Sequence, residues 1–137
     1  GAIGKNCHAA NIIAALYLAT GQDPAHVVEG SLADTNISLS QRERVRVRSS
    51  DSVIIATHLP AILVGVRGGG TTLPAQSQCL NLLLRSKVLG LKSPQQLAES
   101  VGAAVLAGEI SLLAALANND LASAHQNLGR TAQIMVR

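Results

Sequence analysis

The most continuous run of apolar residues lies between positions 93 and 118. It opens with residues that favour a helix start: Ser93 as a cap, Pro94 in the first turn and Gln96 to complete a capping box. It closes at Asn118, which tolerates the left-handed turn after a helix. Since apolar residues lie on nearly every side, the pattern predicts a long helix buried by the rest of the fold.

Polar and small residues within this run limit its environment. Glu99 and Glu109 make it a poor membrane span, so no membrane contact is expected from this segment. Glu109 lies deep in the run, where a carboxylate needs either a partner or the wall of a polar site, and a buried structural role is favoured. Gly102 and Gly108 lower helix propensity, which suggests that other backbone passes close by.

A second helical pattern occupies the first thirty residues. Apolar residues recur at helical spacing over positions 8–20, and Gly21 follows where such a helix should end. Asp23 and Pro24 then form an arrangement typical of a cap and first turn, which predicts a short helix to about Val28. On spacing alone, Asp23 is a structural cap.

The middle of the chain changes to the alternation that favours strands. Residues 37–40 and 44–48 alternate in this way, and the apolar run 53–66 indicates a strand broken near Pro60. The second segment belongs to a stretch with arginine at positions 42, 44, 46 and 48. A solvated sheet edge that resists aggregation is favoured there over a site for an anionic partner.

Three consecutive glycines, residues 68–70, separate the apolar run from a further helix predicted at about 75–84. Such a segment lets backbone N–H groups approach a ligand, and a phosphate near the next helix N-terminus would be well placed. Arg67 adds positive charge beside it. The spacing matches neither a Rossmann fingerprint nor a P-loop, so a plain flexible turn is the alternative.

Composition narrows the class of protein. A chain of 137 residues with 47% hydrophobic content fits one domain with its own core. Tyr17 is the only Phe, Trp or Tyr residue, so the core must be aliphatic, and single-stranded nucleic acid is a poor candidate partner because almost no aromatic side chain is present for base stacking. Cys7 and Cys79 lie in unrelated contexts and are expected to be reduced. These features together indicate an α+β domain with a candidate phosphate loop.

Four stretches occur in the same order as in a known family: HAANIIAALYLATGQDPA, VGVRGGGTTLPAQSQCLNLL, QQLAESVGAAVLAGEISLLAALA and LASAHQNLGR. Together they resemble the catalytic domain of 3-hydroxy-3-methylglutaryl-CoA (HMG-CoA) reductase of the eukaryotic-like class. The resemblance implies that residues 1–137 are the C-terminal part of the substrate-binding domain, cut from a longer chain. In that α+β fold, strands and shorter helices surround a long buried central helix.

The resemblance implies a reaction as well. The family reduces the HMG-CoA thioester with two NADPH to mevalonate and free coenzyme A, a step towards isoprenoids and sterols. Two catalytic residues carry over: Asp23, which would tune neighbouring titratable groups, and His125, which would protonate the departing thiolate. The family's catalytic glutamate and lysine belong upstream of residue 1, so the isolated chain is expected to be inactive.

The resemblance also implies binding residues and partners. The expected NADPH contacts are Gly68, Gly69, Gly70 and Thr71. The expected substrate contacts are His8, Asn11, Leu112, Ala115 and Leu116. No metal and no nucleic acid are expected, and the complete protein would be a homodimer or homotetramer. Its place would be the cytosolic face of the endoplasmic reticulum membrane if eukaryotic, and otherwise the cytoplasm.

A different class of function stays open. A diverged, non-catalytic relative could keep the fold as a coenzyme A-binding or dimerisation module. The presence of both Asp23 and His125 favours the enzyme.

Overall fold

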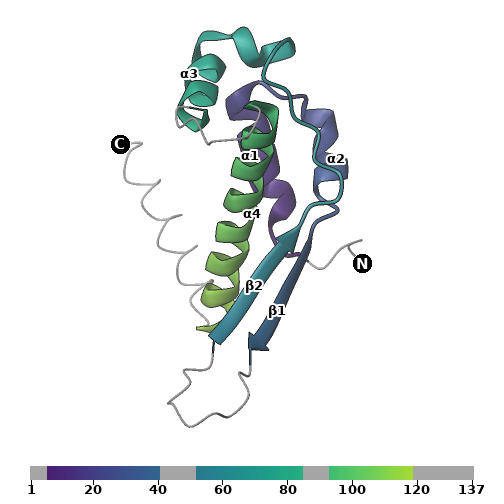
Figure 1. Cartoon of the computed structure of the whole chain (residues 1–137), viewed down its shortest axis with the longest axis vertical. Helices are drawn as coiled ribbons and strands as arrows, with labels where there is room; N and C mark the ends of the chain where they lie inside the picture. Colours follow the sequence, from purple (N-terminus) through teal and green to yellow (C-terminus); the bar gives the residue numbers. More distant parts are fainter. Residues whose placement is uncertain (1–5, 41–51, 85–92, 119–137) are drawn as a thin grey trace, which may run out of the picture.

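A computed structural model describes residues 6–40, 52–84 and 93–118 of the chain. It has mixed helices and strands, which confirms the α+β class (Figure 1). The elements follow the order α1 (Ala9–Thr20), η1 (Pro24–His26), α2 (Val27–Gly30), β1 (Asp34–Ser40), β2 (Ser52–His58), η2 (Gly69–Thr72), α3 (Pro74–Leu83) and α4 (Ser93–Ala117). The two η elements are short 3₁₀ helices.

The core lies between α1 and α4, which run side by side (Figure 1). Each helix buries one narrow stripe of residues spaced four apart, the spacing that places side chains on one helical face. The stripe of α1 consists of Ala9, Ile13 and Tyr17, and that of α4 includes Leu97, Val101 and Val105. Full burial of an aliphatic side chain of this size contributes roughly 1.5–3 kcal/mol, so these stripes hold the two helices together.

The prediction of a helix enclosed on all sides is wrong for the part of the chain that the structure describes. Four residues of α4 are buried, whereas Ile110 and Leu116 are 41% and 46% exposed. Among the described elements, α1, α3 and β2 contact the helix but leave these two side chains exposed. By length and composition α4 would also suit a membrane, and 17% of its most apolar window is buried.

The two strands form an antiparallel pair whose register runs from Asp34 opposite His58 to Ser40 opposite Ser52. The arginine-rich strand predicted at 44–48 lies outside the described residues. The apolar run 53–66 was predicted as one broken strand, and its second half is irregular. Pro60 has no N–H to continue the pairing.

The glycines of α4 accommodate side chains, not backbone, which corrects the expectation of a close backbone approach. A Cβ on Gly108 would come within 1.9 Å of Ile12 Cδ1, so the α1 side chain occupies the space that glycine leaves. A Cβ on Gly102 would make ordinary contact with Leu59 Cδ1 at 3.9 Å.

The remaining helices lie close to their predicted places. Gly21 ends α1 in the left-handed conformation (φ 71°), and Asp23 caps η1, which continues directly into α2. Helix α3 begins at Pro74 and buries Leu80. Cys7 and Cys79 are both free thiols.

Candidate functional site

Two turns from distant parts of the sequence meet backbone to backbone at the end of α1. Gly21 follows that helix, and Gly70 belongs to the glycine loop, which we define as residues 68–71. A Cβ on Gly21 would lie 2.3 Å from the carbonyl carbon of Gly70, and a Cβ on Gly70 would lie 3.1 Å from Gly21 Cα. Real Cβ contacts are essentially never as short as 2.3 Å, so the approach requires glycine at position 21, whereas at position 70 a Cβ would be tightly packed.

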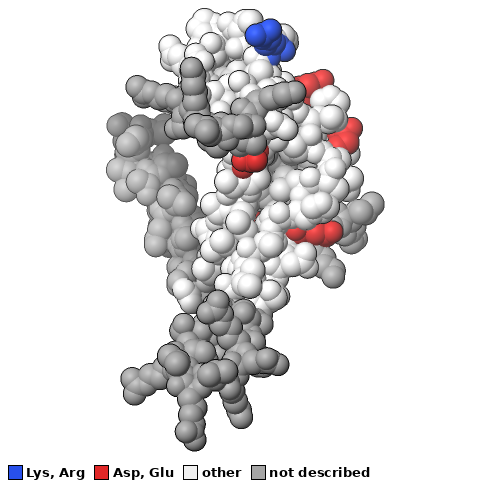
Figure 2. All heavy atoms as spheres, in the orientation of Figure 1, with Lys and Arg blue, Asp and Glu red and all other residues white. Residues whose placement is uncertain are grey.

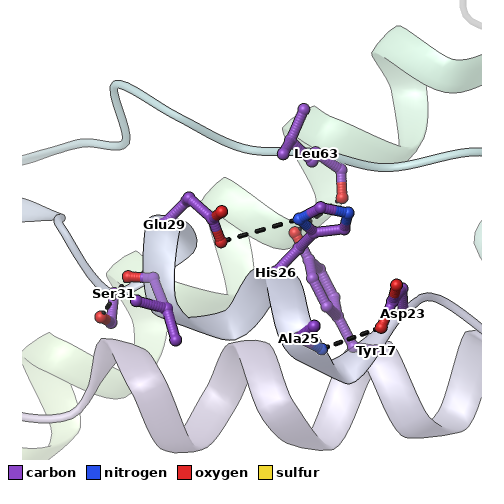
Figure 3. A network of polar contacts seen from close by, with 8 residues as sticks. Tyr17, Asp23, Ala25, His26, Glu29, Ser31 and Leu63 are labelled. Atoms are coloured by element: carbon purple, nitrogen blue, oxygen red, sulfur yellow. Dashed lines mark hydrogen bonds and ion pairs between the residues drawn. The ribbon is translucent and has the colours of Figure 1, made fainter.

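Asp23 follows two residues later and lies exposed beside the glycine loop. Its Oδ1 accepts a hydrogen bond of 2.9 Å from the backbone N–H of Ala25, so the capping role predicted from spacing is confirmed (Figure 3). Asp23 also lines a hollow of about 430 Å³ together with Gly69, Gly70, Leu73 and Gln76, among others. The structure therefore brings the expected catalytic carboxylate and the expected cofactor loop to the same hollow.

The glycine loop combines open backbone with one anchored side chain. Gly68 and Gly69 have positive φ angles of 84° and 56°, and a Cβ on Gly68 would meet nothing within 4 Å. Thr71 is buried, and its hydroxyl donates to the Gly68 carbonyl oxygen at 2.7 Å. That hydroxyl closes the loop, while the space above Gly68 is open to a ligand.

Positive charge near the loop comes from Arg67. Within residues 6–40, 52–84 and 93–118 it is the one lysine or arginine, and it is exposed. Figure 2 accordingly shows a face that is mostly white, with a single blue side chain and scattered acidic ones. An anionic group at the glycine loop would meet this guanidinium.

Asp23 also lines a second hollow of about 270 Å³, together with Gln22, His26, Leu63, Val64 and Gly65. His26 Nδ1 is 3.7 Å from Glu29 Oε2, and both residues lie on the short helices after Asp23 (Figure 3). His26 was not among the site residues predicted from the sequence. The signal was its position three residues after Asp23, since that spacing brings side chains to one side of a helical turn.

Tyr17 holds in place one of the residues that line this hollow, Leu63. Its hydroxyl donates to the Leu63 carbonyl oxygen at 2.8 Å, which ties the irregular segment after β2 to α1 (Figure 3). Burial raises the pKa of the phenol above its ordinary value of 10.0, and the Glu29 charge raises that pKa further. Tyr17 therefore stays neutral and serves as a donor.

The expected substrate residues lie at the opposite end of α1. Asn11 Nδ2 and His8 Nδ1 are 3.1 Å apart beside a hollow of about 130 Å³. Twelve helical residues separate this end from Gly21, a distance of about 18 Å at the usual helical rise. The chain thus does not bring His8 and Asn11 to the hollow that Asp23 lines.

The expected apolar contacts lie near that same end. Leu112 and Ala115 are partly buried and Leu116 is exposed, all on the last turns of α4. Gly108 lies one turn earlier and faces His8, whose Cδ2 would be 3.6 Å from a Cβ on that glycine. His125 lies outside the described residues.

Glu109 has the buried structural role that the sequence favoured. Its carboxylate is 1% exposed and accepts hydrogen bonds from the backbone N–H groups of Cys7 and His8. No group of three or more metal-ligating side chains occurs within the described part of the chain.

The sequence of this chain matches one family of known proteins. The family model described as hydroxymethylglutaryl-coenzyme A reductase matches residues 1–130. A 3-hydroxy-3-methylglutaryl-coenzyme A reductase of Methanocaldococcus jannaschii is 47% identical over 128 residues, which are 93% of this chain and 29% of that protein.

Two further relatives agree. The enzyme of the same name from Halobacterium salinarum is 44% identical over 95% of this chain and 30% of its own length. The 3-hydroxy-3-methylglutaryl-coenzyme A reductase 1 of Oryza sativa subsp. japonica is 43% identical over 95% of this chain and 24% of its own. The chain therefore spans less than a third of the length of these curated relatives.

Proposed function

This chain belongs to the hydroxymethylglutaryl-coenzyme A reductase family, and from that premise we propose that it is part of an NADPH-dependent enzyme that reduces HMG-CoA to mevalonate and coenzyme A. Residues 1–137 would form the C-terminal part of the substrate-binding domain of a longer protein. The complete protein would be a homodimer or homotetramer. It would lie at the endoplasmic reticulum membrane in a eukaryote and in the cytoplasm otherwise.

One observation carries the proposal beyond family membership: the contact between Gly21 and Gly70 holds Asp23 and the glycine loop around one hollow. A titratable carboxylate beside a loop with exposed backbone suits a reaction in which an anionic cofactor binds and a proton moves nearby. Neither feature alone would support this function.

The residues of the loop fit a dinucleotide. The open space above Gly68 admits a phosphate, which a Cβ at that position would restrict. Backbone N–H groups of residues 68–70 would hold the phosphate, since the Thr71 N–H already donates to the Gly68 carbonyl oxygen, and the Arg67 guanidinium would attract it. NADPH, when bound, supplies the hydride for each reduction.

The other residues divide the remaining tasks. Asp23 would interact with the catalytic lysine and glutamate of the complete protein and tune their proton affinities. His125 would donate the proton that the coenzyme A thiolate needs on departure. The acyl substrate would contact His8 and Asn11 on α1 and, on α4, Leu112, Ala115 and Leu116.

The test is an assay of the full-length protein. We expect NADPH oxidation that depends on added HMG-CoA and yields mevalonate and free thiol. The isolated 137-residue chain should show none, because the upstream glutamate and lysine are missing. A full-length protein that binds coenzyme A without oxidising NADPH would establish the binding module in place of the reductase.

A further inference from the structure

The side chain of Gln22 connects the turn after α1 to Gly65, in the segment that leads into the glycine loop. Its Oε1 accepts a hydrogen bond of 2.7 Å from the Gly65 N–H, and its Nε2 donates to the Gly65 carbonyl oxygen at 2.9 Å. The same nitrogen donates to the Thr20 carbonyl oxygen at 3.2 Å. Both N–H bonds of the amide are thus engaged, and one residue of the irregular segment is held at both of its backbone polar groups.

The position of these bonds gives them a role beyond folding. The Gln22 N–H donates to the Tyr17 carbonyl oxygen at 2.8 Å, so Gln22 is fixed to the end of α1. Gly65 lies three residues before the glycine loop, and Asp23 lies one residue after Gln22. The amide therefore bridges the segment that leads into the loop and the turn that carries the carboxylate.

The contact between Gly21 and Gly70 cannot by itself fix the position of the glycine loop relative to the Asp23 turn. It is a close approach of two backbones, which limits how near the turns come but leaves them free to slide or separate. Two hydrogen bonds in fixed directions restrain both of those movements. An amide with its donors and acceptor paired in this way resists replacement by any shorter or charged side chain.

We propose that Gln22 is a positioning residue that holds the glycine loop against the Asp23 turn and thereby sets the affinity for the dinucleotide phosphate. The proposal rests on the proposed function, because it names the loop as the phosphate site. Gln22 also lines the hollow beside the loop, and the role proposed for it is to hold the loop in place, not to take part in the chemistry.

The test compares three variants of the full-length protein. Gln22→Ala removes the bridge. Gln22→Glu keeps the size and one acceptor but turns an anionic oxygen towards the Gly65 and Thr20 carbonyl oxygens, so it should be at least as harmful. Gln78→Ala removes an exposed glutamine of α3 and is the matched control.

For both Gln22 variants we expect the dissociation constant of NADPH, measured by nicotinamide fluorescence, to rise about tenfold, the loss expected from two hydrogen bonds. The KM for HMG-CoA should stay within twofold, since the substrate residues lie at the far end of α1. A residue that only stabilises the fold would lower the unfolding temperature and leave NADPH affinity on the folded fraction unchanged. That result, or an equal rise in both constants, would overturn the proposal.

Hydrogen exchange separates this proposal from the function on which it rests. Faster exchange at Gly65 and through residues 68–71 in Gln22→Ala, with Gln78→Ala unchanged, supports the bridge even if wild-type protein reduces nothing, because the Gly65 N–H loses its acceptor. A wild type without HMG-CoA-dependent oxidation would defeat the proposed function alone. Unchanged exchange in Gln22→Ala would defeat the bridge alone.

Discussion

The buried carboxylate of Glu109, in the second half of α4, accepts a 2.6 Å hydrogen bond from the backbone N–H of His8, at the start of α1. It also accepts from the Cys7 N–H, at 3.1 and 3.0 Å to its two oxygens. His8 has no side-chain capping bond at the start of α1. Glu109 therefore accepts from the N-cap N–H, as the glutamate of a capping box does, but from another helix, and its charge suits the positive end of the α1 dipole.

We expect Glu109→Ala to destabilise the fold by about 2–4 kcal/mol, because two N–H groups lose their acceptor. Glu109→Gln keeps one acceptor oxygen and should cost about half as much. Urea unfolding of both variants measures this, with the exposed Glu99→Gln as control. Equal stability of Glu109→Ala and wild type would show that water replaces the carboxylate.

The two glycines of α4 should respond to alanine in opposite directions. Gly102→Ala has room beside Leu59 and should stabilise the protein by about 0.5–1 kcal/mol through helix propensity. Gly108→Ala places a methyl group against Ile12 and should destabilise by about 1–3 kcal/mol. Thermal unfolding of the two variants tests both expectations. If Gly108→Ala stabilises the protein, the Ile12 side chain can adopt another rotamer at little cost.

Local patterns predicted the helices of this fold well, because caps and apolar spacing act within a few residues. Both ends of α1 and α4 lie within one residue of their expected places. The apolar run after Pro60 misled the strand prediction for a physical reason. Ile62 and Val64 are apolar because they pack on the core, while the backbone around them bonds to the side chains of Tyr17 and Gln22.

The candidate site could be predicted from local sequence patterns only in part. Spacing predicted Asp23 as a cap and the glycines as a candidate phosphate loop, and both features are local. Their contact depends on Gly21 meeting Gly70 across a long stretch of chain, which no periodicity encodes. The functional meaning of Asp23 came only from the family resemblance.

Because of Tyr17, we expect the free energy of unfolding to depend on pH in the alkaline range. Its folded-state pKa is raised above 10.0 chiefly by burial, so the folded protein keeps the phenolic proton after the unfolded chain has lost it. The contribution is fully present below pH 10 and is lost as pH rises through the folded-state pKa. Unfolding free energies measured from pH 8 to about 11 should therefore fall above pH 10.

Tyr17→Phe is the control for this slope. It should cost about 1–2 kcal/mol at neutral pH, since the Leu63 carbonyl oxygen loses its donor. It should also flatten the decline above pH 10. A decline of the same steepness in Tyr17→Phe would assign the alkaline loss to other groups.

Asp23→Asn separates the two roles that this residue has been given. Asparagine is as good a helix cap as aspartate, and its side-chain oxygen can still accept from the Ala25 N–H. Its amide cannot take up or release a proton near neutrality. The fold should therefore be unchanged, with an unfolding temperature close to that of wild type. Turnover of HMG-CoA by the full-length protein should fall by a factor of about 10²–10⁴, the usual contribution of a positioned acid or base.

The control for this substitution removes an exposed carboxylate elsewhere. Glu99→Gln on α4 makes the same change of charge away from the hollow and should leave turnover intact. NADPH affinity should be nearly the same in Asp23→Asn and wild type, because the glycine loop and its bridge to Gln22 are untouched. A fall in turnover that follows a loss of NADPH binding would make Asp23 part of the cofactor site. Near-normal turnover would mean that capping is the whole of its role, because the cap is the one property that the variant keeps.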